Sequence, residues 1–77
     1  MNLKFSVGEI WKDRYDCPYI ILEIHAEPGF PIIAKDIKTN ITCSFTQHGK
    51  EISNHFDSPQ DLITYVGNKK DFPEYQL

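Results

Sequence analysis

The segment that decides the fold is PYIILEIHAEPGFPIIAKDI, at Pro18–Ile37. Its first nine residues alternate between two faces at period two, which predicts a β-strand over Pro18–Ala26. The predicted inward face holds Ile20, Leu22, Ile24 and Ala26, opposite Tyr19, Ile21, Glu23 and His25. The next four residues, EPGF, predict a turn because proline presets φ and Gly29 accepts a positive φ. Pro31–Ile37 then predicts the returning strand.

Three further strands are predicted on either side of this segment, at Gly8–Tyr15, Ile41–Thr46 and Ile63–Val66. In the second of them the inward positions are Ile41, Cys43 and Phe45. Two polar breaks, KTN at 38–40 and QHGK at 47–50, predict tight connections. Gly49 is the expected positive-φ residue of the second break.

SPQDL, at Ser58–Leu62, predicts one helical turn before the last strand, with Ser58 as N-cap and Pro59 at the first helical position. Five short strands spaced by about ten residues predict a mostly β protein, a small five-stranded antiparallel SH3-like barrel. A five-stranded oligonucleotide-binding-type barrel and a β-meander with a docked tail are the alternatives. We expect a single barrel domain at 1–67 and a polar, aromatic C-terminal tail at 68–77 that folding does not require.

Composition excludes several classes of function. The chain has 77 residues, 40% of them hydrophobic, which is enough for one packed core. Its net charge is -3 and its Lys and Arg residues are scattered, so nucleic acid is an unlikely ligand. We find no signal peptide and no apolar run of about 20 residues, which predicts a cytoplasmic protein without a membrane partner.

Candidate chemistry is sparse. The three histidines and two cysteines lack the close pairing of a structural metal site, so no metal and no cofactor is expected, and the histidines are predicted to be surface residues. Turn formation explains Ser58 and Asp61 without catalysis. We therefore expect a protein that is not an enzyme.

Four elements in order resemble a family of small, mostly uncharacterised proteins of tailed phages and prophages. They are a G-x-x-W/Y-x-x-R entry, a P-I strand, an F/Y-T-x-x-G turn and a terminal P-x-D-L. Here these are Gly8, Trp11 and Arg14; Pro31 and Ile32; Phe45, Thr46 and Gly49; and Pro59, Asp61 and Leu62. The resemblance implies a phage origin and a barrel, but no activity. Where the family has a glycine after R-x, this chain has YDC, at Tyr15–Cys17. The resemblance therefore does not extend to the first hairpin.

The aromatic residues are too many for so small a core, and aromatic side chains are frequent anchors of protein interfaces. The predicted partner-binding residues are Trp11, Tyr15, Tyr19, Phe56, Phe72 and Tyr75. The function predicted is a non-enzymatic protein-binding module, a phage-encoded inhibitor of a bacterial host protein or defence system, acting in the host cytoplasm. The alternatives are a nucleotide- or nucleic-acid-binding small barrel and a homo-oligomeric structural protein.

Overall fold

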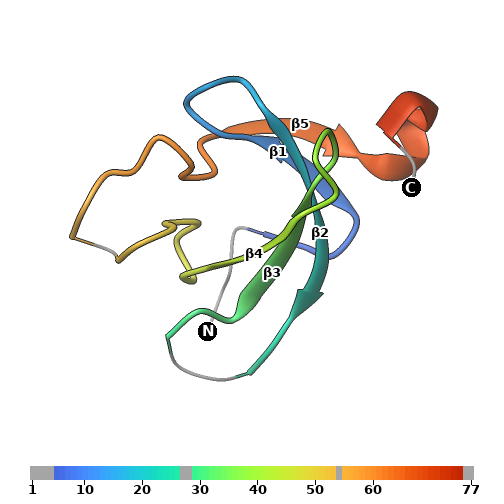
Figure 1. The fold of residues 1–77 in the computed structure, drawn as a ribbon. Coiled ribbons are helices and arrows are strands. Elements are labelled where there is room, and N and C mark those ends of the chain that lie inside the picture. The colour runs from blue at the N-terminus through green and yellow to red at the C-terminus, as the bar shows by residue number, and fades with distance from the viewer. Residues whose placement is uncertain (1–4, 27–28, 54, 76–77) are drawn as a thin grey trace.

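A computed structural model describes residues 5–26, 29–53 and 55–75, apart from the side chain of Tyr75. Figure 1 shows a sheet of five short strands followed by two 3-10 turns. The strands are β1 (Glu9–Lys12), β2 (Pro18–Ile24), β3 (Ile32–Asp36), β4 (Thr42–Phe45) and β5 (Thr64–Asn68). The 3-10 turns are η1 (Lys69–Asp71) and η2 (Pro73–Tyr75).

The strands form one antiparallel sheet in the order β4-β3-β2-β1-β5. The first four strands follow one another as a meander, and β5 returns to pair with β1 (Figure 1). The predicted fold class, mostly β with five antiparallel strands, is confirmed. Among the described residues no strand pairing joins β4 to β5, so the sheet is unclosed and β4 and β5 are its edges.

One face of the sheet carries the main core. Its buried side chains are Trp11, Tyr19, Ile21, Ile32, Ala34 and Phe45 from the strands, joined by Phe5 and Leu62. The strand register explains the set, because Trp11 pairs with Tyr19, Ile21 with Ala34 and Ala34 with Cys43 across the sheet. The predicted inward position of Phe45 is confirmed, since its side chain is fully buried.

Of the predicted inward residues at Pro18–Ala26, namely Ile20, Leu22, Ile24 and Ala26, only Ile24 contacts the main core. Tyr19 and Ile21 face the core, and the register with β3 shifts between Ile21 and Glu23. Leu22 is the extra residue of this bulge and is 38% exposed. Beyond the bulge the alternation is reversed, because a bulge adds one residue to one strand only, and Ile24 packs against the core.

Ile41 is also misplaced by the sequence pattern. It precedes β4 and is exposed, whereas the pattern put it inside with Cys43 and Phe45. It belongs to the turn that joins β3 to β4, in which Asn40 takes a positive φ of 67°. Asp36 N–H donates to Ile41 O and Asn40 N–H donates to Asp36 O, each at 2.8 Å. Ile41 therefore contributes a backbone hydrogen bond to the turn, while its side chain lies in solvent.

The opposite face of the sheet holds a smaller apolar contact. Ile10 and Ile20 pair across β1 and β2, one residue out of phase with the core pair Trp11–Tyr19, and both are buried. Gly67 in β5 pairs with Ile10, and the ring of Phe72 occupies the space where a Cβ on Gly67 would lie. The C-terminal turns therefore fold back onto the sheet beside Ile10.

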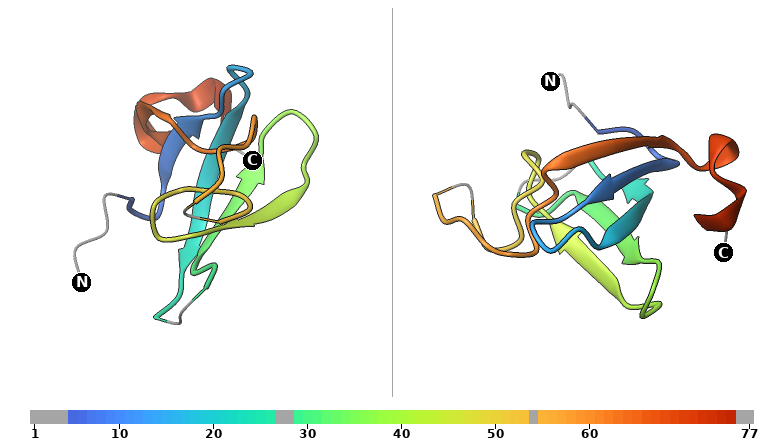
Figure 2. Two further views of the ribbon diagram at one scale, coloured as in Figure 1. Left: turned by 90° about the vertical axis from the view of Figure 1, so that its left-hand side faces the viewer. Right: turned by 90° about the horizontal axis from the view of Figure 1, so that it is seen from above.

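Residues 46–53 and 55–63, which we call the connection, lead from β4 to β5. Figure 2 shows the connection and the C-terminal turns at opposite ends of the sheet. The predicted helical turn at Ser58–Leu62 is a single hydrogen-bonded turn, in which Asp61 N–H donates to Ser58 O at 3.1 Å. The helices of the described residues are the two 3-10 helices that follow β5. Neither is long and apolar enough to cross a membrane.

Candidate binding surface

A buried carboxylate organises the connection. Asp61 is fully buried, and its Oδ1 accepts the backbone N–H of Glu51 while its Oδ2 accepts that of Ser58, each at 2.8 Å. Lys50 Nζ lies 2.9 Å and Arg14 Nη2 lies 3.5 Å from the same Oδ2. Because a buried charge is tolerated only when it is paired and hydrogen-bonded, these four donors explain the position of Asp61.

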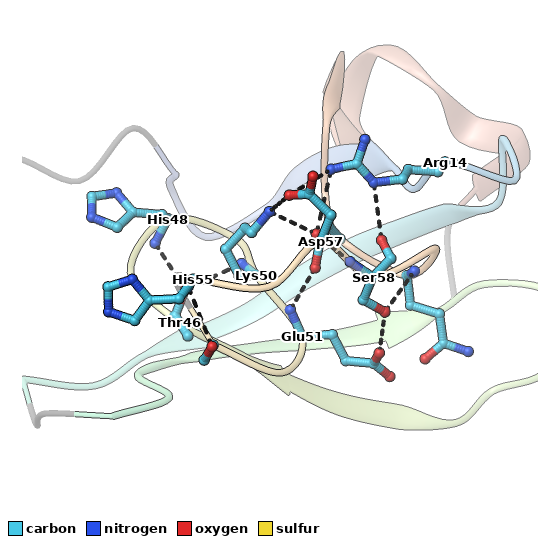
Figure 3. Close-up of polar contacts among 11 residues, drawn as sticks. Arg14, Thr46, His48, Lys50, Glu51, His55, Asp57 and Ser58 are labelled. Carbon is cyan, nitrogen blue, oxygen red and sulfur yellow. Dashed lines mark hydrogen bonds and ion pairs between the residues drawn. The ribbon is translucent and has the colours of Figure 1, made fainter.

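The two cations that contact Asp61 also hold Asp57. Lys50 Nζ lies 2.5 Å and Arg14 Nη2 lies 3.4 Å from Asp57 Oδ1 (Figure 3). The Asp57 side chain is 79% exposed, so this second carboxylate closes the network on the solvent side. The four charges cancel. The network ties the β1–β2 hairpin, through Arg14, to the connection.

The pKa values follow these contacts. Burial raises the pKa of Asp61, but the backbone N–H groups of Ser58 and Glu51 and the ammonium of Lys50 outweigh it, and the net shift is downward. The pKa of Asp57 is lowered, chiefly by its hydrogen bond from Lys50. The pKa of Lys50 is raised, chiefly by its hydrogen bonds to Asp57 and Asp61. Lys50 thus favours the charged forms of both carboxylates, and they favour its charged form in turn.

Further backbone and side-chain hydrogen bonds hold the same region together. Arg14 N–H donates to Pro59 O and Arg14 Nε to Ser58 O, both at 3.0 Å. The Ser58 hydroxyl donates to Glu51 and accepts the N–H of Gln60. These bonds use Ser58 to build the turn, as the sequence predicted.

The break at QHGK is the tight corner that the sequence predicts. Gly49 has φ of 79°, its N–H donates to Thr46 O, and its own O accepts the N–H of Leu62. A Cβ on Gly49 would lie 2.5 Å from the ring of Phe5. The Thr46 hydroxyl accepts the N–H groups of His48 and Lys50. The corner therefore packs directly on the core and has room only for glycine.

Two of the predicted partner-binding residues, Tyr15 and Phe56, lie in solvent at this end of the sheet. Tyr15 is 70% exposed and Phe56 is 64% exposed. Tyr15 follows Arg14 and Phe56 precedes Asp57 in sequence, and Arg14 and Asp57 form an ion pair. We call Tyr15 and Phe56 the aromatic pair. The network places them on the same end although they are far apart in the chain.

Trp11 and Tyr19, also predicted to bind a partner, are core residues. Trp11 contacts the rings of Phe5 and Tyr65 in tilted arrangements, with ring centroids 4.4 and 5.4 Å away, and its Nε1–H donates to Glu9. Tyr19 meets the ring of Phe45 edge-on, and burial raises its pKa. The partner contact predicted for these two is therefore corrected, because their rings are needed to fill the core.

Phe72 and Tyr75 complete the predicted set. Phe72 is half-buried and packs on Gly67, so its ring contributes to the fold rather than extending freely from a tail. Tyr75 ends η2, and its side chain lies outside the described part of the molecule. Removal of the tail is therefore expected to disturb the sheet beside Ile10, against the sequence-based expectation.

Several exposed apolar side chains lie outside the predicted partner-binding set. Ile52 of the connection is 56% exposed, and Ile63 and Tyr65 at the β5 edge are 45% and 53% exposed. The alternation of Ile63 and Tyr65 in the predicted last strand was an available signal. The sequence also held a signal for the ionic network, because Arg14 and Asp61 both belong to the ordered elements that resemble the phage family.

The potential metal ligands do not gather into a site. Within the described residues no group of three His, Cys, Asp or Glu side chains has a geometry that could hold a metal ion. His25, His48 and His55 are all exposed, as predicted. Figure 3 shows the rings of His48 and His55 pointing away from the ion pairs.

No protein-family model, curated protein or solved structure matches this chain, so its resemblance to tailed-phage proteins stays a prediction.

Proposed function

We propose that this protein is a binding module that covers part of another protein, with the aromatic pair as its anchors. The observation that carries the proposal is the ion pair of Arg14 with Asp57, which joins two segments in which an exposed aromatic residue is the neighbouring residue in sequence. Aromatic anchors give large contact area at low cost in side-chain entropy. Ile52, exposed on the same connection, adds apolar area.

Rigid placement supports this function. Anchors bind more tightly when their positions are fixed before the partner arrives, because less conformational entropy is lost on binding. Here the supporting contacts are directional: two backbone N–H groups on Asp61, and Arg14 donating to both Ser58 and Pro59. Together with the corner at Gly49 they fix the connection against the sheet.

The partner that we propose is a bacterial host protein, met in the host cytoplasm by a phage-encoded inhibitor. The elements of the phage resemblance support it, because Arg14, Thr46, Gly49 and Asp61 all hold the end that carries the aromatic pair. Cys17 and Cys43 are both free thiols, which fits a reducing compartment.

Affinity capture from bacterial lysate, followed by measurement of the dissociation constant for the protein captured, tests the proposal. We expect Tyr15→Ala and Phe56→Ala each to weaken binding by about 5- to 100-fold, which is the range for truncated interface anchors. Thermal unfolding of both variants should match the parent, since neither side chain is buried.

Phe30→Ala is the matched control. Phe30 is 41% exposed and lies in the loop between β2 and β3, at the other end of β2 from the β1–β2 hairpin that carries Tyr15. Unchanged binding by the Tyr15 and Phe56 variants, or equal loss in the Phe30 variant, would contradict the proposed surface. Co-purification of nucleotide in place of protein, seen as a shifted 260/280 absorbance ratio, would favour the nucleotide-binding alternative.

A further inference from the structure

β4 is an edge strand whose free side can be assigned residue by residue. In an antiparallel pair, directly opposed residues alternate between exchanging backbone hydrogen bonds and making none. Asp36 N–H donates to Ile41 O, so the next bonded pair along the ladder is Ala34 with Cys43. The N–H and C=O groups of Thr42 and Ser44 consequently point away from β3.

Those outward groups meet no protein partner among the described residues. Both Thr42 and Ser44 are exposed, and every recorded backbone bond of the β3–β4 turn and of the connection is made by other residues. β4 is short, with four residues, but three other protections of a sheet edge are missing. β4 has no proline, no lysine and no register shift against β3.

We propose that a second copy of this chain pairs with β4 in antiparallel orientation, about a two-fold axis through Cys43. The geometry favours a second copy because the edge is complementary to itself. With Cys43 opposite the partner's Cys43, Thr42 of each chain lies opposite Ser44 of the other. Each such pair exchanges two hydrogen bonds. The four bonds of the two pairs therefore use all four outward N–H and C=O groups of each chain.

The side chains on this edge permit the close approach. Thr42 and Ser44 are small and uncharged, so neither bulk nor like charge opposes the pairing. Cys43 would form a non-hydrogen-bonded pair, in which opposed Cα atoms lie about 4.5 Å apart. That spacing is within the range of disulfide-bonded cysteines. The pairing does not involve the aromatic pair, so it is independent of the function proposed above.

The mass of the protein as a function of concentration, measured by analytical ultracentrifugation, tests the pairing with two matched double variants. Thr42→Glu with Ser44→Glu sets like charges opposite each other twice, whereas Thr42→Glu with Ser44→Lys sets opposite charges there twice. Both double variants carry the same Thr42→Glu change, so its contact with Lys35, the neighbour of position 42 on β3, is common to the two. We expect the parent to dimerise, and the Glu/Lys variant to dimerise with a dissociation constant at least about tenfold below that of the Glu/Glu variant.

Cross-linking locates the axis. In a Cys17→Ser background, oxidation with copper phenanthroline should join two chains through Cys43, and Cys43→Ser with Cys17 retained should stay uncross-linked. The reaction is run at alkaline pH, because burial raises the pKa of the Cys43 thiol. A monomeric mass up to the solubility limit, equal dimerisation of the two double variants, or cross-linking through Cys17 alone would each overturn the proposal.

Discussion

The connection and the C-terminal turns are both added to the sheet, at opposite ends, and they are held by different forces (Figure 2). The connection is attached by a buried carboxylate with four donors around it. The C-terminal turns are attached by a backbone hydrogen bond, from Lys69 N–H to Gly8 O at 2.8 Å, and by an aromatic ring on a glycine. Directional contacts fix the position of a segment, whereas apolar contact supplies area and tolerates small shifts.

This difference separates the roles of the two aromatic groups at these ends. The directional contacts around Asp61 fix the segments that carry Tyr15 and Phe56, and both of these side chains are exposed to solvent. At the other end Phe72 is used for packing. Exposed aromatic residues on a polar framework are therefore the better candidates for recognition in this molecule.

The largest effect is expected for Asp61→Ala. Removing this carboxylate leaves Lys50 and Arg14 with the exposed Asp57 as their remaining counter-charge and two backbone N–H groups without an acceptor, at a cost of about 3–5 kcal/mol of folding free energy. Urea unfolding measures it. Asp57→Ala, which removes the exposed carboxylate from the same cations, is the control and should have a much smaller effect. Equal effects would mean that burial of Asp61 is not important.

The same substitution at two glycines compares the two ends directly. Gly49→Ala forces a positive φ on alanine and drives its Cβ into Phe5 and toward Leu62 O, 3.2 Å away, so we expect a loss of about 1–3 kcal/mol. Gly67→Ala also requires a positive φ, of 156°, but the three atoms nearest to its Cβ all belong to the ring of Phe72, which can shift with its turn. Thermal unfolding of both variants should show the larger loss at Gly49. The reverse order would show that the C-terminal turns are the more rigid attachment.

Phe72→Ala measures the apolar attachment itself. Its ring is half-buried, so we expect a loss of about 1 kcal/mol together with faster hydrogen exchange of the Gly67 and Lys69 amides. Glu74→Ala, an exposed position in the same turns, is the control. If Phe72→Ala unfolds at the same denaturant concentration as the parent, the turns do not stabilise the sheet.

The smallest expected effect is a dependence of stability on acid pH that belongs to the connection alone. The pKa values of Asp57 and Asp61 are lowered in the folded protein from an ordinary value of 3.8. The unfolded chain therefore takes up protons first as the pH falls, so this stabilisation is complete above the unfolded pKa and is lost as the pH falls through the folded values. Unfolding free energies at a series of pH values should show the full loss in Phe72→Ala and a smaller loss in Asp61→Ala, in which Asp57 keeps its contacts with Lys50 and Arg14. The double variant Asp57→Ala with Asp61→Ala should show none. A slope retained in the double variant would assign it to other carboxylates.

The five strands were predictable because each is a short run of β-branched and aromatic residues between turn residues. The face of β2 that packs on the core was not predictable, because apolar residues occur on both faces of this strand. Ile20 and Ile21 are both buried, on opposite faces, and the alternation gives no sign of the bulge at Leu22. The bulge depends on the register with β3, which is a property of the pair.

The candidate surface was predictable in part. Tyr15 and Phe56 were found because they stand beside charged residues in polar segments, whereas Trp11 and Tyr19 lie in strands where the same residue types fill the core. The network of Arg14 with Asp57 and Asp61 joins residues more than 40 positions apart. The turn at Ser58 explained Asp61 locally, and nothing local showed that its carboxylate is buried and needs cations.

The return of β5 to β1 sets an order of assembly during synthesis. β2, β3 and β4 can pair as adjacent hairpins as soon as they leave the ribosome, but β1 receives its second neighbour only after Asn68 has emerged. Trp11, the single tryptophan of the chain, contacts the ring of Tyr65 in that last strand. Its indole therefore reaches its final environment when the C-terminal third of the protein arrives, and its fluorescence reports the closing step of folding.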